Sequence, residues 1–192
     1  MRAFRAALAA LLACLSAGCL VAALHPVYDP RLIAFDPSLL GSWSPIEAPE
    51  GRTLTFERGE WHSYHVEYVD GEQRVRASAR LTRVGRDLLL DVSPLDGVDL
   101  PPLTLPIHAI YRVAIEAEQL RLSELDYDTL AGQVRAGMSP IPASLDARGN
   151  VVLTATTQEL RRWLEEMQKE GSDPFAEPTA YERRQALETA EP

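Results

Sequence analysis

The chain has 192 residues, with 28 acidic and 19 basic side chains and a net charge of −9 at pH 7. This length is enough for one hydrophobic core and short for two ordinary domains. A chain this acidic, with no basic stripe, is a poor binder of nucleic acid, so we expect no nucleic-acid partner.

The N-terminal segment has the pattern of an export signal. Arg2 and Arg5 give it a basic start, and no charged residue follows between Ala6 and Leu24. A basic stretch followed by an apolar run with small residues at its end is typical of a secretory signal peptide, which we place at residues 1–18. The run is long enough for a short transmembrane helix, but no cluster of basic residues follows it.

A possible processing site lies at the end of this run. The segment Leu15-Ser16-Ala17-Gly18-Cys19 resembles the lipobox of bacterial lipoproteins, in which the cysteine becomes the acylated N-terminus. The resemblance implies that Cys19 is the lipidation site. With Leu20 next in the chain, it also implies delivery to the periplasmic face of the outer membrane. Cys14 is a competing site, and a plain signal peptide or an anchor helix with incidental cysteines is the alternative.

The cysteine count limits the chemistry of everything downstream. The sequence has two cysteines, Cys14 and Cys19, so the chain after residue 19 has none. A disulfide framework, a cysteine-ligated zinc and a catalytic thiol are therefore excluded there.

Both ends of the remaining chain have loop-like composition. Residues 19–38 contain Pro26, Pro30 and Pro37 and little periodicity, and we expect them to be a lipid anchor and tether. Residues 171–192 combine prolines with mixed charge, which predicts a disordered tail. The folded domain is therefore expected at residues 39–170.

Alternating apolar and polar residues dominate the middle of the chain. They predict strands at 52–57, 62–69, 73–84, 88–92, 107–115, 120–122 and 151–155. Turn signals such as Asp70-Gly71 separate neighbouring strands, and 94–106 is a proline-rich loop. Seven or eight short strands joined by tight turns favour a mainly β fold. We expect an antiparallel meander closed into a barrel or half-barrel, since closure removes the edge strands.

Two helices are predicted, at 127–136 and 156–170. The second has a capping-box pair, Thr156 and Glu159. Its apolar residues fall on one stripe at positions 160, 163, 164 and 167. An amphipathic helix of this kind is expected to pack on the outside of the sheet, the alternative being a helix that binds a partner.

The stretch from Phe35 to Trp43 resembles the opening of a lipocalin, where Gly-x-Trp begins the first barrel strand. Here the motif is Gly41-Ser42-Trp43. The resemblance implies a lipocalin-like barrel whose closed end is plugged by Trp43, with a helix after the last strand. The stretch 40–164 also resembles uncharacterised bacterial lipoproteins, which implies no activity.

No group of residues has the spacing of a catalytic or metal site. His62 and His65 would point to opposite faces of a strand, so they cannot share a metal. Asp126 and Asp128 precede a helix, where acidic residues cap backbone N–H groups. No nucleophile motif or phosphate loop is present. We therefore expect no metal, no cofactor and no enzyme activity.

The leading functional hypothesis is a lipid-anchored protein that binds a small apolar ligand or lipid. The candidate ligand-binding residues are Tyr64, Val66, Tyr68, Ile107 and Tyr111, with Leu54 and Phe56 also facing inward. A packed, dry core is the competing interpretation of these faces. In that case the chain would be an envelope assembly or accessory interaction subunit, using the helix at 157–170 or the acidic surface.

Overall fold

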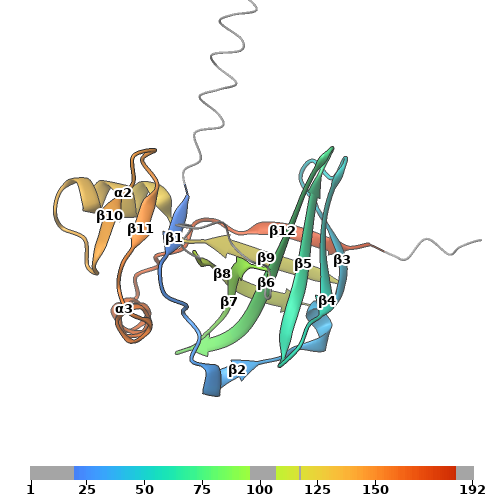
Figure 1. The fold of residues 1–192 in the computed structure, drawn as a ribbon, viewed down its shortest axis with the longest axis horizontal. Coiled ribbons are helices and arrows are strands. Elements are labelled where there is room, and N and C mark those ends of the chain that lie inside the picture. Colours follow the sequence, from blue (N-terminus) through green and yellow to red (C-terminus); the bar gives the residue numbers. More distant parts are fainter. Residues whose placement is uncertain (1–19, 96–106, 117, 185–192) are drawn as a thin grey trace, which may run out of the picture.

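The computed structural model describes residues 20–95, 107–116 and 118–184. Eight antiparallel strands form a closed barrel, because β6 pairs with β7 as well as with β5 (Figure 1). In ring order they are β6 (Gln73–Val84), β5 (Ser63–Asp70), β4 (Arg52–Arg58), β3 (Gly41–Pro45), β12 (Thr179–Arg183), β9 (Gln119–Glu124), β8 (Ala109–Glu116) and β7 (Asp87–Pro94). The predicted mainly β fold, an antiparallel barrel, is confirmed.

Tight turns set the register of the longest hairpins. Asp70 pairs with Gln73 across β5 and β6, so only Gly71 and Glu72 connect the two strands. Gly71 has a φ of 58°, in the left-handed region that glycine adopts without steric cost. The turn between β6 and β7 has the same form, with Gly85 at a φ of 56°.

The strand that closes the barrel comes from the segment expected to be a disordered tail. β12 pairs with β9 on one side and with β3 on the other. The expectation of a tail from residue 171 is therefore wrong for the described part, and residues 185–192 lie outside the described residues. The strand pattern of β12 is weak because the strand is short and charged at its end. Its stability comes from backbone hydrogen bonds to two strands distant in sequence.

The expected tether is also folded from Val21 onward. β1 (Val21–Ala23) is buried and pairs in parallel with β11 (Val151–Leu153), which also pairs with β10 (Ala143–Leu145). It is followed by η1 (Pro30–Leu32), β2 (Ile33–Ala34) and η2 (Pro37–Leu39), of which β2 pairs with β6. The prolines at 30 and 37 begin 3-10 helices capped by the preceding aspartates, so they are not linker residues.

Two helices were predicted at the correct places. α2 (Tyr127–Arg135) begins after Asp126, whose carboxylate accepts a hydrogen bond from the backbone N–H of Thr129. α3 (Thr157–Glu170) begins with the expected capping box. Both lie beside the barrel with β10 and β11 (Figure 1). The expected amphipathic helix packed beside the barrel near the C-terminus is confirmed. The strand expected at 151–155 lies in the side sheet as β11, and β12 follows α3, so the helix does not come after the last barrel strand.

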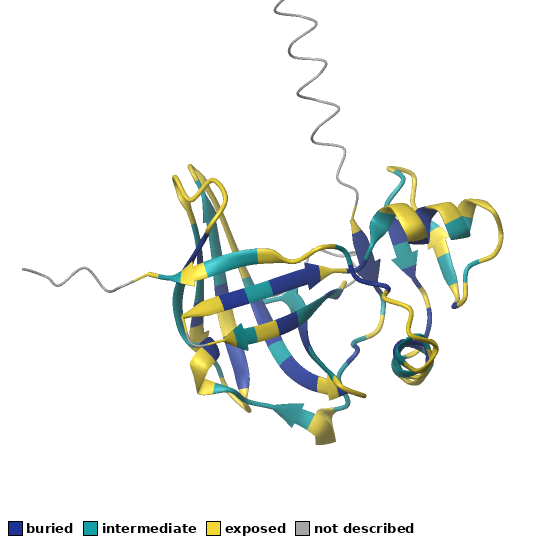
Figure 2. Ribbon diagram, turned by 180° about the vertical axis from the view of Figure 1, so that it is seen from behind, coloured by how far each residue is buried: buried dark blue, intermediate teal, exposed yellow. Residues whose placement is uncertain are grey.

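The hydrophobic residues divide into two clusters. One lies inside the barrel, with Trp43, Phe56 and Tyr64 among its members. The other lies between the outer wall of the barrel and the side unit of β1, β10, β11 and the helices, with Leu89 and Trp163 among its members. Figure 2 shows buried segments both in the barrel strands and in the side unit next to them. In the described part of the chain, no helix has the length and apolar character needed to cross a membrane.

Candidate functional site

One end of the barrel is closed by packed side chains. Trp43 is fully buried, and its indole N–H donates to the backbone oxygen of Leu39 over 3.0 Å. The guanidinium of Arg183 lies 4.2 Å from the centre of the Trp43 ring and caps it. Tyr64 is also fully buried, and its hydroxyl bonds both backbone groups of Asp36. This end leaves no room for a ligand.

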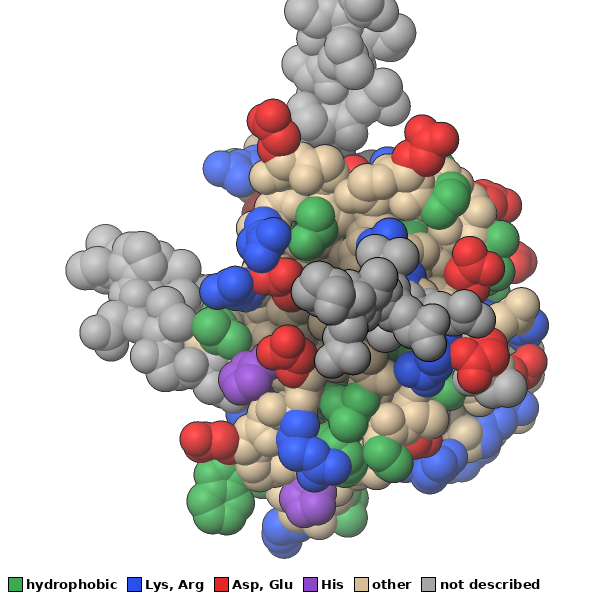
Figure 3. Space-filling view, turned by 90° about the vertical axis from the view of Figure 1, so that its right-hand side faces the viewer, with side chains coloured by type: hydrophobic (Ala, Val, Ile, Leu, Met, Phe, Trp, Pro, Cys, Tyr) green, Lys and Arg blue, Asp and Glu red, His purple; other side chains and the backbone are tan. Residues whose placement is uncertain are grey.

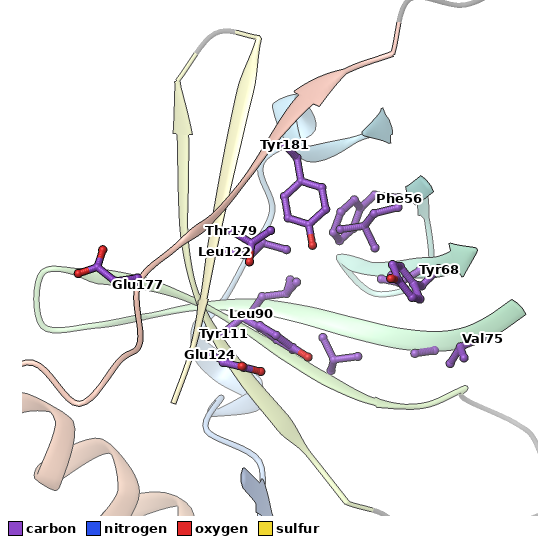
Figure 4. Close-up of a pocket in the computed structure, with 14 residues that line it drawn as sticks. Phe56, Tyr68, Val75, Leu90, Tyr111, Leu122, Glu124, Glu177, Thr179 and Tyr181 are labelled. Atoms are coloured by element: carbon purple, nitrogen blue, oxygen red, sulfur yellow. The ribbon is translucent and has the colours of Figure 1, made fainter. Parts of the chain in front are cut away.

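The opposite end of the barrel contains a cavity of about 400 Å³. Small-molecule sites have volumes of ~300–1,000 Å³, so this one has room for a small ligand. Its lining is mainly apolar and comes from seven barrel strands and the segment before β12 (Figure 4). The lining residues are Leu54, Phe56, Val66, Tyr68, Val75, Ala77, Leu90, Val92, Tyr111, Leu122, Glu124, Glu177, Thr179 and Tyr181.

Strand alternation explains why these side chains face inward. On β5, Tyr64, Val66 and Tyr68 share the inner face, with Tyr64 at the closed end and Tyr68 near the mouth. On β9, Leu120, Leu122 and Glu124 share the inner face in the same way. The polarity of the lining therefore changes along the barrel axis, from an apolar floor to a mouth with hydroxyl and carboxylate groups.

Three tyrosines bring their hydroxyl groups into this cavity. The Tyr68 hydroxyl donates to the Asp70 carboxylate over 3.4 Å. No other described residue forms a hydrogen bond with the hydroxyl of Tyr111 or Tyr181, and Figure 4 shows both pointing into the cavity. Burial is the main cause that raises the pKa of all three phenols above its ordinary value. They therefore remain neutral hydrogen-bonding groups at neutral pH.

Two carboxylates complete the lining. Glu124 lies directly opposite Tyr111 in the register of β8 and β9. In Figure 4 its carboxylate lies close to Tyr111, whereas that of Glu177 points away from the tyrosines. Among the described residues, neither carboxylate forms an ion pair, and the lining contains no Lys, Arg or His.

Only some of the candidate ligand-binding residues identified from the sequence line the cavity. Val66, Tyr68 and Tyr111 line the cavity, as do Leu54 and Phe56. Tyr64 does not line the cavity, because it lies below it in the closed end and its hydroxyl is already bonded. Ile107 is also misplaced: it precedes β8, is 41% exposed and does not line the cavity.

Sequence reasoning missed Tyr181 and Glu124. Tyr181 lies on β12, in a segment interpreted as tail. Glu124 could have been found, because it continues the alternation of Leu120 and Leu122 and so had to face inward. Cys14, Cys19 and residues 96–106 of the proline-rich loop lie outside the described residues.

The other polar residues considered from sequence form no second site. His62 precedes β5 with a φ of 62°, and His65 is exposed on the outer face of the barrel. Asp126 caps α2. Within residues 20–95, 107–116 and 118–184, no cluster of three or more His, Cys, Asp or Glu side chains is arranged to hold a metal ion.

Fold and cavity together define the class: a closed antiparallel barrel with a pocket of small-molecule size at one end. No protein-family model, no curated protein and no solved structure matches the chain.

Proposed function

We propose that this chain is a non-catalytic binding protein that takes up a small apolar ligand or lipid in the barrel cavity. The observation that carries the proposal is the 400 Å³ cavity lined mainly by apolar side chains. Protein interiors are otherwise close-packed, so a cavity of this size at the end of a packed barrel is best explained by an occupant.

The test is a titration of the full chain with N-phenyl-1-naphthylamine, an uncharged fluorescent probe. We expect saturable binding to one site. Ala77 lines the cavity on β6, opposite Val66 on β5, so Ala77→Phe places a ring inside the cavity. It should weaken the affinity for the probe about tenfold or more, equivalent to about 1.4 kcal/mol.

The matched control is Ala114→Phe. Ala114 is exposed on β8, opposite Arg121, so the same substitution there leaves the cavity unchanged. We expect unchanged probe affinity. If the native chain binds no apolar probe, or if both variants bind it as the native chain does, the cavity is not a ligand site. An envelope assembly or accessory subunit would then be the better description.

The second part of the proposal is the anchor. The lipobox-like segment ending in Cys19 supports acylation of that cysteine and attachment to the outer membrane, facing the periplasm. The acidic charge gives no attraction to anionic head groups, so the acyl chains would supply the membrane affinity.

Metabolic labelling with a fatty-acid probe tests the anchor. Cys19→Ser should abolish the label and release the protein into the soluble periplasmic fraction, with Cys14→Ser as its control. Loss of the label in Cys14→Ser alone would move the site to Cys14. Retention in both variants would contradict lipidation.

A further inference from the structure

The charged side chains among the described residues of the cavity lining are all negative. Of the 14 described residues that line the cavity, two are glutamates and none is basic. On the face that Figure 3 shows, acidic and basic side chains are interspersed, in contrast to the lining. Glu124 lies on the inner face of β9, opposite Tyr111, which places a carboxylate at the cavity mouth.

One arginine lies near the mouth of the cavity but is already paired. Arg52 begins β4, and its partner Asp70 also accepts the hydrogen bond from the Tyr68 hydroxyl. Its guanidinium is paired with Asp70 over 3.2 Å, so the two charges largely cancel. The charges that remain among the described lining residues are those of Glu124 and Glu177, and Glu124 is the one beside Tyr111.

The tyrosines respond to that charge. After burial, the Glu124 charge is the second cause that raises the pKa of Tyr111, and it also contributes to the raised pKa of Tyr181. Burial opposes a charge of either sign, but the contribution of Glu124 is that of a negative charge, which opposes a carboxylate or phosphate ligand and attracts a cation. The aromatic rings add to this, because the face of a tyrosine ring attracts a cation within about 6 Å of its centre.

We propose that the ligand of this cavity is an amphiphile with a positively charged amine. The amine would lie between Glu124, Tyr111 and Tyr181, and the apolar part would lie along Leu54, Phe56 and Leu122. The inference rests on the proposed ligand-binding function and names the chemical class of that ligand. An anionic lipid or fatty acid would place its charge beside Glu124 without a basic partner among the described lining residues, which is unfavourable.

Three competitors that share one tail test the charge. Decylammonium, decanol and decanoate are titrated against N-phenyl-1-naphthylamine bound to the full chain. We expect decylammonium to compete about tenfold or more better than decanol, and decanoate to compete worst. Glu124→Gln should remove the advantage of the amine over the alcohol, measured as the ratio of the two competitor affinities in that variant.

Glu116→Gln is the control for the loss of one negative charge. Glu116 ends β8 at the other end of the barrel and pairs with Arg121, so the amine should keep its advantage in this variant. If the neutral probe binds but decylammonium has no advantage, or if the advantage persists in Glu124→Gln, the inference of a cationic ligand is wrong while the cavity remains a binding site. If no compound binds, the binding function itself is wrong.

Discussion

Asp91 shows how one carboxylate attaches the N-terminal segment to the barrel. It lies on β7, and its side chain points away from the barrel interior because Leu90 and Val92 point inward. One carboxylate oxygen accepts from the backbone N–H of Val27 over 2.7 Å, and the other lies 2.6 Å from Nδ1 of His108. Both side chains are buried, so the carboxylate has protein partners in place of water.

Removal of this carboxylate should destabilise the whole protein. Asp91→Ala leaves the Val27 N–H and the His108 ring buried without their partner, and breaking a buried pair from one side costs about 3–5 kcal/mol. Asp91→Asn, which keeps an acceptor, should cost less. Urea unfolding of the three proteins measures the difference.

The control for this prediction is Glu116→Ala. It removes an exposed carboxylate whose pair with Arg121 is 3.6 Å long, and exposed pairs contribute at most about 1 kcal/mol. Equal unfolding midpoints for Asp91→Ala and Glu116→Ala would refute a structural role for Asp91. The sequence predicted only that Asp91 lies in a strand, since its partners are 64 and 17 residues away.

Among the secondary-structure elements, α3 was predictable because its signals are local. The backbone N–H of Glu159 donates a hydrogen bond to the hydroxyl oxygen of Thr156. In return, the backbone N–H of Thr156 donates to the Glu159 carboxylate over 2.8 Å. Leu160, Trp163 and Leu164 are buried on the stripe that the sequence showed. The helix therefore packs on the barrel with its apolar face covered, as its pattern indicated.

The capping box predicts that the stability of the fold depends on pH through Glu159. Hydrogen bonds from the backbone and the hydroxyl of Thr156 lower the pKa of the Glu159 carboxyl. A lowered folded-state pKa means that the carboxylate contributes stability above its unfolded pKa, and that this contribution is lost as the pH falls through the folded value. Thr156→Ala should cost about 1 kcal/mol at neutral pH.

An NMR titration of the Glu159 carboxyl provides the direct measurement. Its pKa should lie below the usual value in the native chain and move partly back in Thr156→Ala, because the backbone N–H remains. An unshifted native titration would contradict the capping geometry.

At the scale of the whole molecule, ring closure depends on β12, which the sequence did not reveal. β12 lies between β3 and β9 and is the strand that joins them. Without β12, β3 and β9 would both become open edges of the sheet. A chain truncated after Pro178 should therefore unfold without cooperativity or aggregate through these edges. A chain truncated after Arg184 keeps every described contact of β12 and should unfold as the full chain does.

Thermal unfolding followed by near-UV circular dichroism, with light scattering, separates the two truncations. Cooperative unfolding and a monomeric state in both would show that the barrel holds without β12.

The cavity, like the barrel, could be predicted only in part from the sequence. Strand alternation placed Val66, Tyr68 and Tyr111 on the inner face, whereas the position of Tyr181 depends on a strand whose pairing is entirely long-range.

The parallel pairing of β1 limits how far the folded domain could move away from a membrane anchor at Cys19. Leu20 is held on both sides, its N–H by the Asn150 side chain and its carbonyl oxygen by the Val151 N–H. One residue of extended chain spans only about 3.5 Å. With acyl chains on Cys19, as proposed, the folded domain would lie directly on the bilayer, with no flexible linker between them. It would meet molecules that diffuse laterally along that leaflet and would not reach across the space beyond it.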